Sequence, residues 1–434
     1  MNRTAELARF AATLEAKTLP PAVVADVKRL LLDAVASALV GWTSPQSHQL
    51  DGTARALFGN GDVTVFAGTP MSAAGAALVN GYLTTARSFC DVHRQTLCHV
   101  TPVVVPAALA AAEEARASGP DLIAGLAAGM EALLRIGTAL DYPEFRRRGW
   151  HTPGVAGPLG AALAAARVAG LDADRTTHAM GLAGSQAGGT FASFGSPAIK
   201  FHQARAAMAG LISARLAAAG FEGSPDILTA DDGGLLGTFS NGGDPGALTD
   251  GLGSGWHIGE IATRRWPAAA ALQPVIESIL DADLKPDDVV AVTVGLPPDG
   301  FRMHAGVGWE SPFTATLSAR WVTAVSVHDR EAWLPQFGAD RISDERTGEL
   351  ANRVTVTEEP GLGDGEAAVA VTTTSGEHRL NPVIPNPDWE ATVAKARRAA
   401  DGVLPPGSVD TLVESIGSLE GVDDVSELLA PLRP

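Results

Sequence analysis

The stretch "VVADVKRLLLDAVASALVGW", residues 23–42, decides the fold of the larger part of the chain. Its apolar side chains recur at the i, i+3, i+4, i+7 spacing of one helix face, and they are Val24, Val27, Leu30, Leu31, Ala34 and Val35. The preceding "TLPP" places prolines where a first helical turn accepts them. The pattern predicts an amphipathic helix that buries one face against other helices.

Two more long segments have the character of helices. "GPDLIAGLAAGMEALLRIGTAL" (119–140) opens with a proline suited to a first turn, and "KFHQARAAMAGLISARLAAAGF" (200–221) is closed by Gly220. Both are rich in Ala and Gly, so neighbouring helices can approach closely. We therefore predict a large helical domain over residues 1–258.

The composition changes near residue 260. Three valine- and threonine-rich stretches are typical of strands, namely 288–297, 352–360 and 367–380, and Ser375-Gly376 marks a hairpin turn in the last. Residues 311–327 between them have a helical pattern. We predict a smaller α+β domain over 259–388, with 389–434 returning as helices to the large domain. A chain of 434 residues is long enough for two such domains.

Charge and cysteine content exclude several classes of protein. The formal charge of −17 argues against nucleic acid as a partner, because binding it requires neutralising phosphates. The two cysteines, Cys90 and Cys98, cannot make a disulfide framework. Residues 1–17 lack the apolar core of a signal peptide, and we find no uninterrupted apolar run for a membrane helix. We expect a cytoplasmic protein with no membrane partner.

The stretch "FCDVHRQTLCHVTP", residues 89–102, gathers an acid and two imidazoles, Asp91, His93 and His99. These side chains are of the types that hold zinc or iron, but no HxxxH, HExxH or CxxC spacing accompanies them. We therefore expect no metal site. No GxSxG or GxGxxG motif points to a serine nucleophile or a nucleotide cofactor. Proton transfer and an ordinary surface loop remain.

Two other segments favour proton transfer. "RRRGWHTPGVAGPLGAAL" (146–163) places His151 at the start of a helix after three arginines, and "SPAIKFHQ" (196–203) places Lys200 and His202 at the start of another. Each segment alone is typical of a solvated surface. Together, cations and helix N-termini favour an anionic substrate beside histidines that titrate near neutrality.

The order of several motifs resembles the MmgE/PrpD family, which includes 2-methylcitrate dehydratase, cis-aconitate decarboxylase and iminodisuccinate epimerase. The motifs are "FCDVHRQTLCHVTPVVVPAALAAAE", "GWHTPGVAGPLGAALAAARVAGLD", "AMGLAGSQAGGT" and "IKFHQARAAMAGLISARLAAAGFEG". The resemblance spans nearly the whole chain, is specific from residue 89 to 228 and is diffuse beyond residue 264. It implies a large all-helical domain, a smaller α+β domain, a homodimer and no metal or organic cofactor.

The resemblance also implies site residues. Asp91, His99, His151 and Lys200 fall on positions of the family's large-domain active site. Gln95 stands on the same loop where relatives often have a small hydroxyl residue. We assign Gln95 and His93 to substrate binding, although His93 has no clear family role.

The smaller domain departs from the family pattern. Arg264 stands at or near a lysine position, and Trp321 stands where decarboxylase-like relatives carry a tyrosine. A histidine expected after the following proline is missing from residues 268–272. We assign Arg264 and Trp321 to substrate binding. The changes count against both cis-aconitate decarboxylation and methylcitrate dehydration in their family form.

The resemblance implies a lyase that dehydrates a small polycarboxylate or hydroxy acid by removing a proton beside a carboxylate. In this hypothesis His151 or His99 is base and acid, Asp91 orients one imidazole, and Lys200 with Arg264 holds carboxylates. The alternatives are an epimerase or a decarboxylase with the same residues. A protein that binds a carboxylate without reacting is a third alternative, against which the presence of Asp91, His99, His151 and Lys200 argues.

Overall fold

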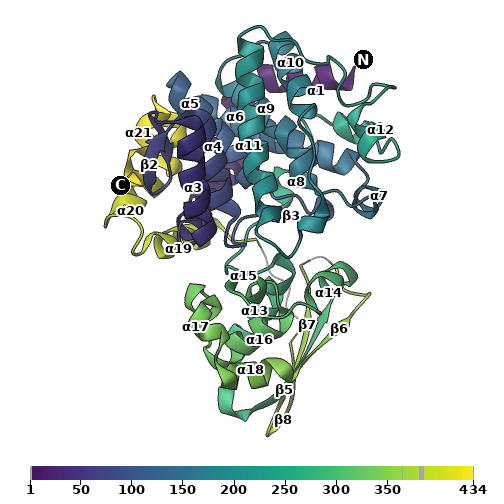
Figure 1. Cartoon of the computed structure of the whole chain (residues 1–434), viewed down its shortest axis with the longest axis vertical. Coiled ribbons are helices and arrows are strands. Elements are labelled where there is room, and N and C mark those ends of the chain that lie inside the picture. The colour runs from purple at the N-terminus through teal and green to yellow at the C-terminus, as the bar shows by residue number, and fades with distance from the viewer. Residues whose placement is uncertain (1, 364, 381–385, 434) are drawn as a thin grey trace. The chain divides into compact units, whose positions relative to one another are not determined.

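The computed structural model describes residues 2–363, 365–380 and 386–433, and the chain forms two compact units. The first unit comprises Met1–Ala86, Cys90–Thr263 and Asp388–Pro434, and the second comprises Arg87–Phe89 and Arg264–Pro387. Figure 1 shows that helices dominate the first unit and that a four-stranded sheet belongs to the second.

The core of the first unit consists of long helices packed side by side. They are α2 (Pro21–Gly41), α4 (Ala73–Thr85), α5 (Thr101–Ala115), α6 (Gly119–Ala139), α9 (Gly157–Val168), α10 (Ala173–Gly184) and α11 (Ala198–Ala218). Helix α9 contacts α5, α6, α10 and α11, while α4 contacts α2, α5 and α11 (Figure 1). The three helices that the sequence predicts most strongly are confirmed as α2, α6 and α11.

Small residues allow the backbones of these helices to approach closely. A Cβ atom added to Gly129 of α6 would lie 2.6 Å from the Ala164 Cβ atom and 2.6 Å from the carbonyl oxygen of Gly160, both on α9. A Cβ atom added to Gly210 of α11 would lie 2.4 Å from the Ala161 Cβ atom. The Ala and Gly content of the sequence is therefore a packing requirement at these positions.

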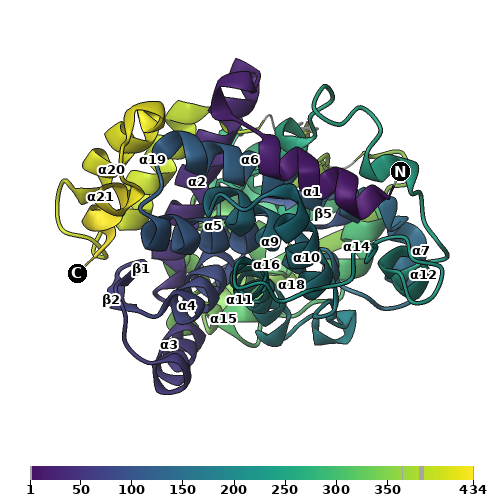
Figure 2. The same ribbon diagram turned by 90° about the horizontal axis from the view of Figure 1, so that it is seen from above.

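Shorter elements surround this core. Helix α1 (Arg3–Thr13) packs against α9 and α10 (Figure 2). The other helices are α3 (Pro45–Phe58), α7 (Tyr142–Arg147), α8 (Thr152–Val155) and α12 (Leu235–Phe239). Two pairs of short strands that the sequence does not predict join them: β1 (Val63–Val65) with β2 (Gly68–Met71), and β3 (Val92–His93) with β4 (Ile261–Ala262).

The C-terminal segment returns to the first unit as α19 (Trp389–Ala400), α20 (Ser408–Gly417) and α21 (Val425–Leu429). Helix α19 packs against α2. Its Lys395 forms a buried ion pair with Asp33 of α2, with 2.7 Å between Nζ and Oδ1. Two distant parts of the sequence are thereby held together.

Helix α6 corrects one expectation. It is long and apolar enough to cross a membrane by length and composition, whereas we expected no such run from the sequence. However, 94% of its most apolar window is buried inside the structure. This is how the core helix of a globular unit behaves, so the apolar character of α6 is explained by its contacts with α5 and α9.

The second unit contains a sheet with the strand order β6-β5-β7-β8. Strands β5 (Val289–Leu296) and β6 (Val354–Glu358) are parallel, whereas β7 (Ala368–Thr373) is antiparallel to both β5 and β8 (Gly376–Leu380). The predicted hairpin is confirmed, although its turn lies one residue earlier, at Thr374 and Ser375, because Thr373 pairs with Gly376.

Helices accompany this sheet: α13 (Gln273–Asp281), α14 (Pro298–His304), α15 (Pro312–Ala315), α16 (Ala319–His328), α17 (Ala339–Ile342) and α18 (Glu345–Asn352). Helices α13, α16 and α18 contact its strands (Figure 1). The helical pattern predicted over residues 311–327 is confirmed, but it is divided into α15 and α16, because Ser318 begins a new helix by accepting the amide of Trp321 with its hydroxyl.

Candidate active site

A tight loop in the first unit carries the predicted acid and imidazoles. It begins at Asp91, directly before β3, turns through the short 3₁₀ helix η2 (Arg94–Thr96) and leads into α5. The amide of His93 donates to the carbonyl of Cys98 at 2.7 Å, and Leu97 takes the left-handed conformation at φ 45° that the reversal requires. Pairing of β3 with β4 fixes the start of the loop.

The carboxylate of Asp91 is fully buried and lies at the beginning of α5. It accepts the amides of Val100 at 2.8 Å and Thr101 at 3.0 Å, and also the hydroxyl of Thr101. Burial raises the pKa of the Asp91 carboxyl to about 6, and the hydrogen bonds from Thr101 and Val100 oppose that rise. Its side chain therefore anchors the loop onto α5.

The imidazole of His99 is oriented by the main chain. Its Nδ1 atom lies 2.6 Å from the carbonyl oxygen of Asp91, so Nδ1 carries the proton and donates it. Whenever this ring holds a single proton, its lone pair is on Nε2. Asp91 orients an imidazole, as expected, but the orienting atom is its carbonyl oxygen. The resulting tautomer suits a general base.

His93 and Gln95 differ in their surroundings. The His93 ring is buried, with Nδ1 2.8 Å from the Thr96 hydroxyl and Nε2 3.2 Å from the carboxylate of Glu260. Burial lowers the pKa of His93. These bonds tie the loop to the residues before β4. Gln95 is exposed on η2. A substrate contact by His93 or Gln95 stays a prediction.

His151 is connected to this loop through the residue that follows it. The hydroxyl of Thr152 donates to the carbonyl oxygen of Thr96 at 2.7 Å. His151 is the N-cap residue of α8, which confirms its expected place at a helix start. Its Nδ1 atom lies 3.0 Å from Nδ1 of His202 on α11. Two histidines from separate helices are thus in direct contact.

Positive charge surrounds His151. Lys200 is the third residue of α11 and is only 6% exposed. Burial lowers the pKa of His151 well below its ordinary value, and the charges on His202, Lys200 and Arg146 lower it further. His151 is therefore neutral at pH 7. Arg146 itself lies over the Phe191 ring, 3.5 Å from the centroid.

Arg205 is a structural residue of this site that the sequence did not reveal. Its guanidinium donates to the carbonyl oxygens of Gln186 at 2.6 Å, Gly154 at 3.2 Å and Gly188. These bonds hold residues 186–188 and α8 against α11. An arginine on a helix pattern gives no sign of such distant carbonyl partners.

The second unit contains the two other predicted residues. Arg264 is 4% exposed, and its Nη1 atom donates to the carbonyl oxygen of Ser88 at 2.6 Å. The Trp321 side chain is fully buried, donates from Nε1 to the carbonyl oxygen of Gln336 at 3.1 Å and stacks on Trp309 with 5.7 Å between ring centroids. A contact of either residue with substrate stays a prediction.

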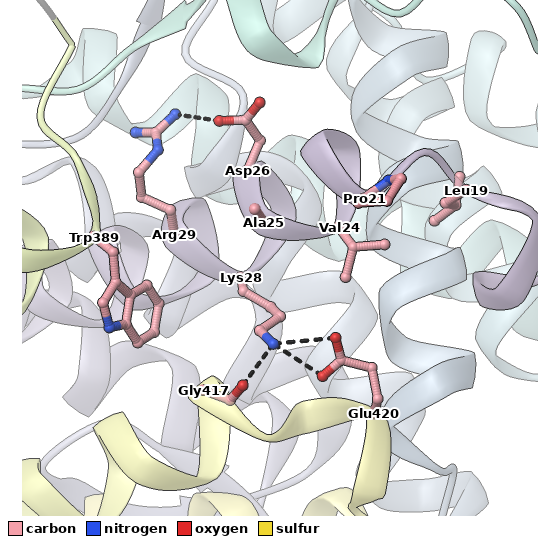
Figure 3. A pocket seen from close by; sticks show the side chains of 10 residues that line it. All are labelled: Leu19, Pro21, Val24, Ala25, Asp26, Lys28, Arg29, Trp389, Gly417 and Glu420. Carbon is pink, nitrogen blue, oxygen red and sulfur yellow. Dashed lines mark hydrogen bonds and ion pairs between the residues drawn. The ribbon is translucent and has the colours of Figure 1, made fainter.

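A cavity of about 670 Å³ in the first unit is lined by none of the predicted site residues (Figure 3). It is lined by the start of α2, by Trp389 and by residues near the end of α20. Lys28 is paired with Glu420 at 2.9 Å, and Arg29 with Asp26 at 3.0 Å (Figure 3). Because both cations of the lining already have acidic partners, this cavity is poorly suited to a carboxylate.

Metal binding has no geometric support in residues 2–363, 365–380 and 386–433, where no group of three or more His, Cys, Asp or Glu side chains is placed to hold an ion. Asp91, His93 and His99 share a loop but each is engaged with different partners. What the loop offers is an oriented imidazole.

Comparison with known proteins gives matches over most of the chain. The model of the MmgE/PrpD N-terminal domain matches residues 5–247, and that of the MmgE/PrpD C-terminal domain matches residues 266–418. The cis-aconitate decarboxylase-like protein oryM of Aspergillus oryzae is 29% identical over 99% of this chain and 97% of its own. Cis-aconitate decarboxylase of Aspergillus terreus is 27% identical over 99% of this chain and 96% of its own. Human cis-aconitate decarboxylase is 24% identical over 95% and 90%.

Proposed function

The chain belongs to the MmgE/PrpD family and is an enzyme of the lyase type, and we propose that it breaks a bond beside a carboxylate of a small polycarboxylate by proton transfer alone. The observation that carries this proposal is the hydrogen bond between Nδ1 of His99 and the carbonyl oxygen of Asp91. Its proton is committed to the Asp91 carbonyl at 2.6 Å, which leaves Nε2 as the basic nitrogen. No metal or organic cofactor is needed for such a step.

His151 and Lys200 supply the complementary part of the chemistry. A neutral imidazole exchanges protons with a reacting carbon or hydroxyl, while the buried ammonium of Lys200 favours a carboxylate. A carbanion beside a carboxylate spreads its negative charge onto the carboxylate oxygens. Positive charge held in advance near those oxygens stabilises this intermediate more than the substrate, which lowers the barrier.

Dehydration is the first candidate reaction. A histidine takes a proton from the carbon next to a carboxylate, and the electron pair of that C–H bond forms a carbon–carbon double bond. The hydroxyl on the neighbouring carbon leaves as water after a second histidine has given it a proton. Asp91 and the main chain around it keep the imidazole of His99 in place during this exchange.

Decarboxylation is the second candidate, and it is favoured by the names of the relatives. Here the bond to a carboxylate breaks, CO₂ leaves, and the electron pair stays on carbon until a histidine protonates it. The family resemblance implies a tyrosine at the position of Trp321 in decarboxylases, and this change counts against the reaction. Both reactions use the same histidines and the same cation.

Proton NMR of the purified chain with a panel of carboxylates tests the proposal. The panel contains citrate, methylcitrate, malate, cis-aconitate and iminodisuccinate. Dehydration predicts a new vinyl resonance from a hydroxy acid, and decarboxylation predicts loss of one carboxylate with release of CO₂. Inversion at carbon without elimination would contradict the lyase proposal and favour an epimerase.

We also propose that the chain is a homodimer and lies in the cytoplasm. Light scattering on the same preparation tests the homodimer, and fractionation of the native host tests the cytoplasmic location.

A further inference from the structure

We propose that His202 is a positioning residue that holds the proton of His151 on Nδ1 and thereby keeps the lone pair of His151 on Nε2. The tautomer itself is a property of the folded chain. Its consequence for catalysis, that His151 acts as a base at Nε2, rests on the proposed lyase function.

The contact between the two rings requires a single shared proton. Their Nδ1 atoms are 3.0 Å apart, which is a hydrogen-bond distance. Two facing imidazole nitrogens form such a bond only when one carries a proton and the other a lone pair. The two histidines are therefore in opposite tautomers. Burial lowers the pKa of each ring, so neither is protonated on both nitrogens at pH 7.

The backbone around the pair holds this geometry. The amide of His151 donates to the carbonyl oxygen of Gly189 at 3.0 Å. Gly189 has φ +146°, and a Cβ atom there would lie 2.9 Å from Nδ1 of His202, so only glycine leaves room for the ring. Arg205 fixes the neighbouring Gly188 and the Gly154 carbonyl from the same helix that carries His202.

Burial decides which ring donates. His151 is 5% exposed, and its Nε2 atom has no hydrogen-bond partner among the residues that the structure describes. Water reaches the partly exposed His202 ring more readily than the His151 ring, so an Nε2–H is satisfied more easily on His202, and an N–H without an acceptor is costlier than a lone pair without a donor. The proton of His151 is therefore on Nδ1 and is donated to His202. The His202 ring is only partly buried, so its own Nε2–H can reach water.

The charged neighbours favour this arrangement. Lys200 on α11 and Arg146 on α7 oppose a second proton on His151, and Arg205 opposes one on His202. The acceptor nitrogen of His202 offsets the repulsion from these cations during proton transfer. When Nε2 of His151 takes a proton from a substrate, the new imidazolium still donates its Nδ1–H to His202, which stabilises it.

The test measures the tautomer of His151 directly. The full chain is labelled with ¹⁵N-histidine, the His151 resonances are assigned with His151→Phe, and long-range ¹H–¹⁵N spectra identify the protonated nitrogen. We expect Nδ1–H in the unmodified chain. His202→Leu removes the acceptor and should shift His151 toward Nε2–H. His202→Asn places an amide oxygen near the former Nδ1 position and should retain Nδ1–H.

Three results would overturn the proposal. The first is Nε2–H on His151 in the unmodified chain, and the second is an unchanged His151 tautomer in His202→Leu. The third is an equal loss of the Nδ1–H tautomer of His151 in His202→Leu and His202→Asn. His178→Leu, on α10, is the matched control because the hydrogen-bond contacts of its Nδ1 atom within the described residues are with the backbone of Gly223. It should leave the tautomer of His151 unchanged. Should His202→Leu fail to fold, His202→Asn and the unmodified chain still decide the tautomer.

Activity gives a second readout once a substrate is known. His202→Leu should lower kcat by roughly tenfold to a hundredfold with little change in KM, a loss typical when the residue orienting a histidine is removed. His202→Asn should recover most of it. A failed lyase proposal removes this second readout and leaves the tautomer measurement intact, so the two failures are distinguishable.

Discussion

The Nδ1 atom of His99 lies 2.6 Å from the carbonyl oxygen of Asp91, and the carboxylate of the same Asp91 caps the amides of Val100 and Thr101. One residue therefore orients the imidazole with its backbone and secures the loop with its side chain. The tautomer of His99 follows from the folding of the loop, so it exists before any substrate arrives.

Replacing His99 by Asn separates these two roles. The amide nitrogen of Asn can occupy the place of Nδ1 and donate to the Asp91 carbonyl, while the basic Nε2 is lost. We expect turnover to fall by roughly 10²- to 10⁴-fold, as is typical for loss of a general acid or base, with the thermal midpoint nearly unchanged. Steady-state kinetics and calorimetry measure both quantities.

His178→Asn is the control for that change, because His178 also uses Nδ1 for a backbone contact, with Gly223. It should keep its activity. A His99→Asn protein with normal turnover would remove His99 from the mechanism.

The buried carboxyl of Asp91 predicts an unusual pH dependence of stability. Its pKa is raised to about 6 in the folded chain, above the ordinary 3.8, so the folded state holds the proton more tightly between those values. Stability from this group falls as the pH rises from about 4 to 6, by on the order of 3 kcal/mol. The unfolding free energy of the unmodified chain minus that of Asp91→Asn should fall over this window. A difference that is constant or rises with pH would contradict the assignment.

His304 in the second unit predicts the opposite dependence. The ring is buried, its Nδ1 atom donates to the carbonyl oxygen of Leu317 at 2.9 Å, and burial lowers its pKa from 6.5 to about 4. The stabilisation is complete above pH 6.5 and is lost as the pH falls toward 4, by on the order of 3 kcal/mol. His304→Asn keeps a hydrogen-bond donor but does not titrate. Urea titrations should therefore show that the unfolding free energy lost by His304→Asn, relative to the unmodified chain, becomes smaller as the pH falls from 6.5 to 4. If the unfolding free energies of the two proteins change in parallel with pH, the titration of His304 does not contribute to this dependence.

Close packing of α6 against α9 predicts that one added methyl group at Gly129 lowers the unfolding free energy. Gly129→Ala should lower the unfolding free energy by about 1–3 kcal/mol, since its Cβ atom would meet Gly160 and Ala164 at 2.6 Å. Gly52 of α3 is the control, because a Cβ atom there has no heavy atom within 4 Å. Gly52→Ala should stabilise the chain by about 0.5–1 kcal/mol through helix propensity. Equal effects at the two positions would refute the packing argument.

The long helices were predictable because their apolar residues recur in the sequence at the spacing of a helix. Helix α2 begins at Pro21, within the predicted first turn, and the predicted apolar positions are buried except Val24, which is half-buried. The prediction of a single buried face was wrong for residues 30–41, which are buried on all sides. The strand pair β3 and β4 was not predictable, because two-residue strands form through pairing across about 170 positions of chain rather than through local propensity. The break at Ser318 was missed since apolar spacing continues across it while the cap is a local hydrogen bond.

The residue types of the site were predictable, and their partners were not. His151 and Lys200 stand at helix starts, as the flanking Gly and Pro residues indicated. The contact between His151 and His202 joins two helices 51 positions apart, so only the packing of α8 on α11 reveals it. The three carbonyl partners of Arg205 are also distant from it in the sequence, so only the packing reveals them.

The central claim is that this chain moves a proton at a carbon beside a carboxylate. The most direct measurement is deuterium incorporation at that carbon, followed by NMR in D₂O with the unmodified chain and with His99→Asn, on whichever member of the carboxylate panel reacts. We expect rapid deuterium incorporation or vinyl formation with the unmodified chain, and a rate lower by at least about a hundredfold with His99→Asn. Turnover that gives neither deuterium at that carbon nor a vinyl product, or equal rates with both proteins, would contradict the proposal.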